Sequence, residues 1–308
     1  MAITYLTRGR LLRVHGLLAL ALAATIVAAV TIGPVALDWR RALDPSLGSA
    51  DAVILFRTRV PRVLLAAVVG GALATAGAAL QALLRNPLAD PHLLGVSSGA
   101  ALAGVCAIVL QPVFLGRTVV VPAAAFAGAL ASMAIVVGAS RVGGRLDSYT
   151  LLLVGVIYNA FAGALLMFIN SVVDFYQAHG VLFWLMGSLS GGDYSIVAAL
   201  ALYTLIGLGA LVLRARDLDC LSLGDDRAAE LGVDVERARL VVFVAASLLV
   251  GAVVSVSGMI GFVGLIVPHL VRMLIGADHR LLLSCSSTSR RRSSTCGTRS
   301  RSSTSSST

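Results

Sequence analysis

Long uncharged stretches alternate with short charged ones along most of the chain. A helix of about 20 apolar residues crosses a hydrocarbon core of roughly 30 Å. Six uncharged runs reach about that length: 14–37, 63–84, 93–116, 118–140, 148–173 and 194–213. The pattern therefore predicts an all-α fold, a polytopic bundle of membrane-spanning helices.

A further apolar region, residues 240–271, contains no Asp, Glu or Arg and is too long for one straight span. Gly258 and Gly261 near its middle predict a break, which gives one full helix and one shorter helix. The less apolar residues 175–192 predict a short interfacial helix with Trp184 as its anchor. Eight spans are therefore expected.

The end of the chain differs in kind, because residues 284–308 contain only Ser, Thr, Arg, Cys and Gly. One interpretation is a disordered, solvated tail. The other, which we favour, is a shifted reading frame: all five residue types have codons with C or G in the second position, and the apolar pattern stops after Leu283. We divide the chain into a transmembrane domain, 1–283, and an anomalous tail, 284–308.

Composition agrees with a membrane protein and excludes one activity. The chain is 58% hydrophobic and 13% charged, against about 45–50% and about 25% in soluble domains. It contains no Lys, so it lacks the lysine of a nucleotide-binding P-loop and cannot hydrolyse ATP in that way. The four Cys show no CxxC spacing and the His no i, i+4 pair, so no metal or cofactor is expected.

The arginines indicate topology rather than nucleic-acid binding, because most of them flank apolar runs. With the N-terminus in the cytoplasm, thirteen fall inside: Arg8, Arg10, Arg13, Arg85, Arg141, Arg145, Arg214, Arg216, Arg227, Arg237, Arg239, Arg272 and Arg280. Six fall outside: Arg40, Arg41, Arg57, Arg59, Arg62 and Arg117. The excess of arginines on the inner side predicts that the N-terminus lies in the cytoplasm.

Several motifs are similar to the FecCD family of ABC importer permeases, which carry ferric siderophores, haem and vitamin B12. They are RVPR at 59–62, RNPLADPHLLGVSSGA at 85–100, LGDDRAAELGV at 223–233 and GMIGFVGLIVPHLVR at 258–272. The resemblance covers about residues 10–283. It implies ten spans, of which the last two would fall in the region of the tail. It also implies a second permease subunit as homodimer or heterodimer, separate ATPase subunits and an external substrate-binding protein.

The long charged segment 214–239 contains a candidate amphipathic helix, which Gly224 and Gly232 could bracket. A solvated loop is the plain alternative. The resemblance instead implies a coupling helix that docks on the ATPase. The candidate coupling residues are Leu223, Gly224, Ala228, Ala229, Leu231 and Gly232.

A polar turn between two spans carries two prolines, which cannot continue a helix without losing a hydrogen bond. An ordinary turn and the inner mouth of the transport path are compatible interpretations. The resemblance implies an inner-mouth or pathway set of Gln81, Asn86, Pro87, Asp90, Pro91, Gly261 and Pro268. Pro268 is expected to break or kink its helix, and the neighbouring His269 to be structural rather than a ligand.

Arg59 and Arg62 lie on the predicted outer side, against the trend of the other arginines. They could contact lipid headgroups, whereas the resemblance implies docking of the external binding protein.

The function expected from this resemblance is uptake of an iron chelate, in particular a ferric siderophore, across the cytoplasmic membrane, with ATP used by a partner chain. Vitamin B12 and haem are the alternatives within the family. A secondary transporter would need a carboxylate inside a span, and a membrane-embedded enzyme would need clustered His, Asp or Glu. The predicted spans offer neither.

Overall fold

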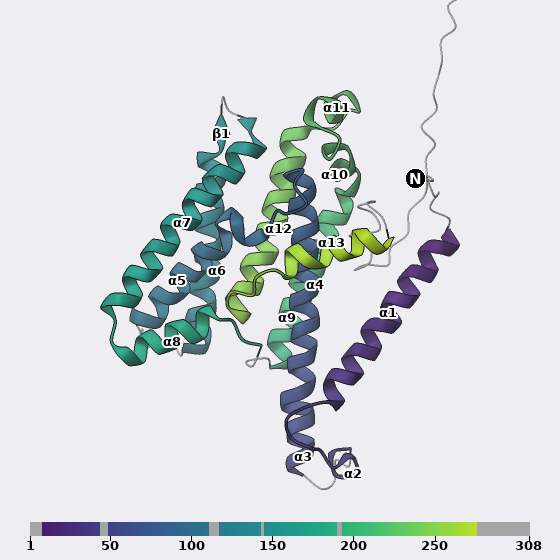
Figure 1. Ribbon diagram of the computed structural model, residues 1–308, viewed down its shortest axis with the longest axis vertical. Helices are drawn as coiled ribbons and strands as arrows, with labels where there is room; N and C mark the ends of the chain where they lie inside the picture. The colour runs from purple at the N-terminus through teal and green to yellow at the C-terminus, as the bar shows by residue number, and fades with distance from the viewer. Residues whose placement is uncertain (1–7, 44–48, 111–116, 143–144, 190–192, 276–308) are drawn as a thin grey trace, which may run out of the picture.

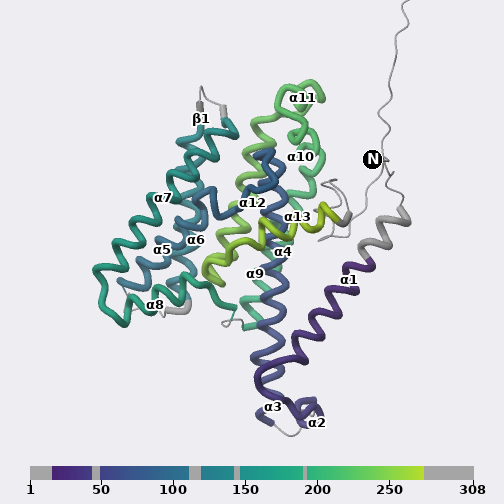
Figure 2. The backbone as a smooth tube through the Cα atoms, viewed as in Figure 1, coloured from purple at the N-terminus to yellow at the C-terminus, as the bar shows by residue number. Residues whose placement is uncertain are grey.

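The structure is a computed structural model that describes residues 8–43, 49–110, 117–142, 145–189 and 193–275 (Figure 1 and Figure 2). Its elements in chain order are α1 (Arg8–Thr31), α2 (Trp39–Ala42), α3 (Ala50–Val53), the π-helix η2 (Ile54–Arg59), α4 (Val60–Leu83), the 3-10 helix η3 (Pro91–Leu94), α5 (Val96–Leu110), α6 (Arg117–Ala139), β1 (Arg141–Val142), β2 (Arg145–Leu146), α7 (Ser148–Val172), α8 (Phe175–Leu185), α9 (Tyr194–Leu213), α10 (Ala215–Leu221), α11 (Asp225–Glu230), α12 (Val235–Ser257) and α13 (Val263–Ile275).

The described part is helical apart from one two-residue antiparallel pairing between β1 and β2. Five of its helices are long and apolar enough to cross a membrane, and three shorter apolar helices accompany them, Gly16–Thr31, Val96–Leu110 and Val263–Met273. These eight correspond to the eight apolar spans predicted from the sequence, and the all-α prediction is confirmed. The predicted tail, 284–308, lies outside the described residues.

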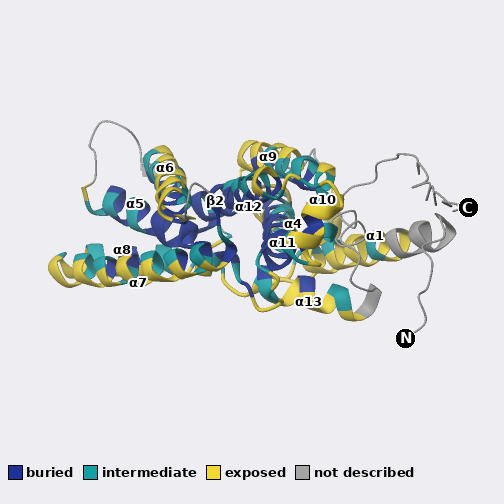
Figure 3. Cartoon of the chain, turned by 90° about the horizontal axis from the view of Figure 1, so that it is seen from above, coloured by how far each residue is buried: buried dark blue, intermediate teal, exposed yellow. Residues whose placement is uncertain are grey.

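Helices α4 and α12 lie side by side at the centre of the bundle (Figure 1). The most apolar stretch of α12 is 72% buried and that of the span containing α4 is 56% buried, but that of α7 is only 17% buried. Many of the buried side chains in α4 and α12 are alanines, which let membrane helices pack closely. The exposed positions of α6, α7 and α9 (yellow in Figure 3) leave faces for lipid or other subunits.

The predicted break within 240–271 is present. Helix α12 ends at Ser257, and its C-cap residue Gly258 has φ of +70°, a left-handed conformation that glycine adopts without strain. The chain then restarts as α13, which runs across α4 instead of along it (Figure 1). Pro268 does not break this second helix, which continues through it. Of the break or kink expected at Pro268, a break is absent, because the interruption of the chain lies upstream, before Val263.

Helix α8 corresponds to the predicted short helix in 175–192. Its half-buried Trp184 indole packs on Gly104 of α5 so closely that a Cβ at Gly104 would lie 2.7 Å from the ring. Trp184 thus holds α8 against the bundle.

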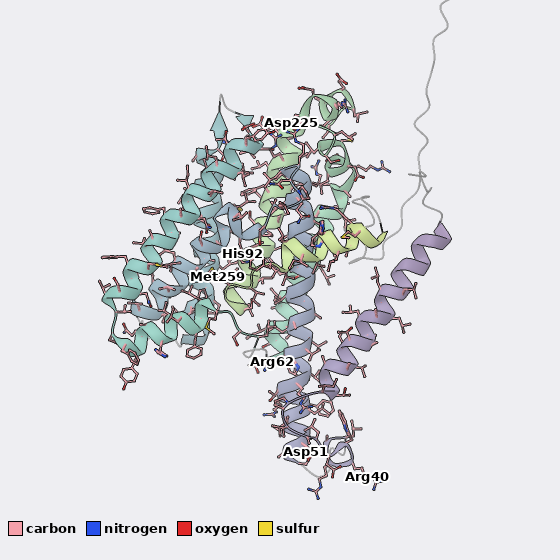
Figure 4. All side chains as sticks on the ribbon, viewed as in Figure 1. Arg40, Asp51, Arg62, His92, Asp225 and Met259 are labelled. Atoms are coloured by element: carbon pink, nitrogen blue, oxygen red, sulfur yellow. The ribbon has the colours of Figure 1, made fainter. Side chains whose placement is uncertain are left out.

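The two ends of the bundle carry different elements. The hairpin β1–β2 and helices α10 and α11 lie at one end, and α2 and α3 at the other (Figure 1). Figure 4 places Asp225 at the first end and Arg40 and Asp51 at the second. The segments predicted to face the cytoplasm, 141–146 and 214–239, therefore share one end.

Candidate functional site

The coupling segment, residues 223–233, forms the predicted short helix, α11. Gly224 precedes it with φ of +116° and Gly232 follows it with φ of +83°. At the C-terminal end of α11 the Gly232 N–H donates to the Ala229 carbonyl, and the Val233 N–H donates to the Ala228 carbonyl. Both glycines occupy backbone conformations that other residues rarely adopt, so they set where α11 begins and ends.

The candidate coupling residues divide into one that faces inward and others that face out. Ala228 is fully buried, whereas Leu223 is 56% exposed and Leu231 is 63% exposed. Ala229 and Gly232 are also exposed. Ala228 therefore fixes α11 to the bundle, and two large apolar side chains remain accessible at this end, as a docking surface requires.

A second site lies where α13 crosses α4. A Cβ on Gly77 would lie 2.6 Å from the carbonyl carbon of Gly264, and a Cβ on Gly264 would lie 3.0 Å from the Leu73 carbonyl oxygen. Backbone therefore meets backbone here, which only glycine permits.

Gln81, buried in α4, completes this junction. Its Nε2 lies 3.4 Å from the Gly264 carbonyl oxygen and 3.3 Å from that of Leu265, and donates to both. Its Oε1 accepts a 2.6 Å hydrogen bond from Nη1 of Arg272. Arg272 belongs to α13 and is half-buried against α4.

The segment between α4 and α5 folds back into the bundle. The Asn86 side chain accepts from the Leu88 N–H, and that of Asp90 accepts from the His92 N–H. His92 lies in the middle of the molecule (Figure 4), where its Nε2 donates to the Ile260 carbonyl at 2.7 Å. The buried Pro91 ring packs against Gly264, so closely that a Cβ on Gly264 would lie 2.8 Å from the ring.

The structure thus brings only some of the predicted pathway residues together. Gln81 and Pro91 meet α13 around Gly264, four residues before Pro268. Asn86 and Pro87 stay in the turn after α4. Gly261 is exposed, with no atom within 4 Å of where its Cβ would stand.

The outward arginines differ from each other. Arg59, at the end of η2, donates from Nη1 to the carbonyls of Val30 and Thr31 at 3.2 and 3.3 Å, and from Nη2 to that of Val35. It therefore closes the C-terminal end of α1, whose last carbonyls have no partners within the helix. Arg62 is exposed and lies toward the same end of the bundle as α2 and α3 (Figure 4).

Known proteins resemble this chain over most of its length. The FecCD transport family model matches residues 20–289. The ABC transporter permease YvrB of Bacillus subtilis, uncharacterized in its substrate, is 43% identical over 252 residues, which cover 80% of this chain and 70% of that protein. The hemin transport system permease HmuU of Yersinia pestis is 43% identical over 275 residues, 87% of this chain and 80% of HmuU.

The fold agrees. A solved structure, described as an inward-facing conformation of a metal-chelate type ABC transporter, matches with a TM-score of 0.79 at 32% identity, covering 89% of this chain and 85% of that one. The chain therefore belongs to the FecCD transport family and is the permease of an ABC importer.

Proposed function

We propose that this permease carries a ferric siderophore across the cytoplasmic membrane, with its N-terminus in the cytoplasm and with ATP hydrolysed by partner subunits. The observation that carries the proposal is the likeness to a hemin permease and to a metal-chelate transporter, both of which concern chelated metals. Haem is the second candidate, because HmuU matches 87% of this chain. The permease works by alternating access, binds no cofactor of its own and acts with a second permease subunit.

The experiment is uptake by the complete importer in proteoliposomes. The permease is reconstituted with its ATPase and its binding protein, and ATP-dependent accumulation of radioiron-loaded ferrichrome, hemin and cobalamin is compared. Preferential uptake of ferrichrome supports the proposal. Uptake of hemin or cobalamin alone would refute the siderophore assignment but leave the importer assignment intact.

We further propose that the coupling segment docks on the ATPase through Leu223 and Leu231. Gly232→Trp is a poor test, because φ of +83° strains any side chain there whatever the partner does. Leu231→Glu changes an exposed side chain instead. We expect it to lower ATPase copurification by about tenfold or more, since a charge replaces a buried apolar contact. Leu231→Met, which keeps the apolar contact, is the matched control, and normal copurification of Leu231→Glu would contradict the proposal.

At the other end we propose that Arg59 and Arg62 belong to the docking surface for the external binding protein. Arg62 supplies the accessible charge, and Arg59 holds the surface in place through the end of α1. Rim charges mainly speed encounter. We therefore expect Arg62→Glu to slow association of the binding protein by about tenfold at low salt and by less at high salt.

The control for this measurement is Arg40→Glu, which makes the same charge change at an exposed position on α2, beside the proposed surface. Arg59 is left unchanged, because reversing it would also release α1. An association rate for Arg62→Glu equal to that of the unaltered permease, at both salt concentrations, removes Arg62 from the surface.

A further inference from the structure

One carboxylate joins the coupling segment to the membrane helices. Asp225, the first residue of α11, lies with Oδ2 2.8 Å from Nη2 of Arg239 and 3.6 Å from Nη2 of Arg85. Arg239 belongs to the first turns of α12, and Arg85 follows the end of α4. A single side chain of the coupling segment therefore meets one charge on α12 and one just past the end of α4.

Arg239 extends this contact to the strand that leads into α7. Its side chain is only 6% exposed, and its Nη1 donates to the carbonyl of Leu146, two residues before α7 begins. Arg239 also acts on the adjacent Asp147. The pKa of Asp147 is lowered mainly by the hydrogen bond that its carboxylate accepts from the Thr150 N–H, and to a smaller extent by the positive charge of Arg239. A guanidinium this buried needs a counter-charge, and Asp225 provides it.

The contact to Arg85 rests on unusual backbone. Arg85 has φ of +50°, which non-glycine residues rarely adopt. Gly224 beside it has φ of +116°, and a Cβ there would lie 3.6 Å from Nη1 of Arg85. Strain of this kind persists only where the surroundings hold it, and the guanidinium of Arg85 lies close to α11.

We propose that Asp225 is a positioning residue for energy coupling, which transmits movement of the ATPase-docked α11 to α4, α12 and α7 through Arg85 and Arg239. The inference rests on the proposed docking of the coupling segment. In that scheme Leu223 and Leu231 face the ATPase, while Asp225 faces the permease. Loss of the Asp225 charge then leaves the ATPase bound but breaks the link between its movement and the pathway.

The test compares Asp225→Asn with Glu236→Gln, which neutralises an exposed carboxylate in the first turn of α12, outside the coupling segment. Complete importers are measured in proteoliposomes for ATPase copurification, ATP hydrolysis and substrate moved per ATP, using whichever of ferrichrome, hemin and cobalamin the unaltered importer takes up. We expect Asp225→Asn to keep the ATPase and hydrolysis but to move about tenfold less substrate per ATP. Glu236→Gln should behave like the unaltered importer, and Asp225→Glu should restore part of the substrate moved per ATP.

An unchanged ratio in Asp225→Asn overturns the proposal. So does loss of ATPase copurification, which would make Asp225 a docking residue. If Asp225→Asn fails to fold, Arg85→Gln provides the test, because the Arg85 side chain is 33% exposed and its replacement should be tolerated. We expect Arg85→Gln to lower the substrate moved per ATP, and an unchanged value again overturns the proposal. Failure of docking itself is detected separately by Leu231→Glu, since that variant tests binding of the ATPase and not transmission.

Discussion

Replacing Gly77 with alanine is expected to lower both the stability and the yield of this permease. The new Cβ would lie 2.6 Å from the carbonyl carbon and 2.8 Å from the Cα of Gly264, and closer still to the carbonyl oxygen. These atoms are backbone and cannot rotate away, so α13 would have to move off α4. Overpacking of this kind costs about 1–3 kcal/mol, which corresponds to a fall in Tm of about 2–12 °C at about 2–4 °C per kcal/mol.

The measurement is the yield and Tm of the detergent-purified permease. The same helix supplies controls, because a Cβ on Gly70 or Gly71 would have no atom within 4 Å. Gly70→Ala and Gly71→Ala should leave Tm unchanged or raise it slightly, since alanine favours a helix over glycine by about 1 kcal/mol. A Gly77→Ala permease as stable as these controls would mean that α13 does not cross α4 at this contact.

The elements of this fold could be predicted from the sequence because they depend on local chemistry. Uncharged runs marked the apolar helices, and Gly258 marked the break before α13. Gly224 and Gly232 marked the limits of α11, because each sits where the backbone turns left-handed. In each case the signal and its consequence lie within a few residues of each other.

Partnerships across the chain could not be predicted in the same way. Gln81 and Gly264 are separated by 183 residues, and nothing in either neighbourhood indicates the other. Arg59 resembles a surface charge in the sequence, yet its partners are the carbonyls at the end of α1. The Asp225–Arg239 ion pair was likewise missed, because a charged segment between spans has the same composition whether its charges are paired or solvated.

Pro268 shows how a contact from another helix can prevent the break that a proline favours locally. Proline removes one N–H from the helix, the one that would bond to the carbonyl four residues earlier, on Gly264. In isolation that loss favours a break. Here Gln81 from α4 donates to the Gly264 carbonyl, so the missing partner comes from another helix and α13 continues. Membrane helices tolerate proline when a neighbour satisfies the freed group in this way.

This compensation predicts that Gln81 and Pro268 are energetically coupled. Gln81→Leu should leave the Gly264 carbonyl and Nη1 of Arg272 without their partners in an apolar setting. An unsatisfied buried group costs about 1–3 kcal/mol, and more when it is charged. We therefore expect Gln81→Leu to lower Tm by several degrees and to reduce transport.

Adding Pro268→Ala to Gln81→Leu should restore part of that loss, because alanine at 268 supplies the N–H that the Gly264 carbonyl lacks. In the unaltered background Pro268→Ala should have little effect, since Gln81 already serves that carbonyl. Gln81→Glu separates the two halves of the contact, because it keeps an acceptor for Arg272 but loses the donor to the α13 carbonyls. The Tm of Gln81→Glu should therefore lie between those of the unaltered and Gln81→Leu permeases. The check is a double-mutant cycle on Tm and unfolding free energy. Strictly additive effects of Gln81→Leu and Pro268→Ala would show that the glutamine does not replace the hydrogen bond that the proline removes.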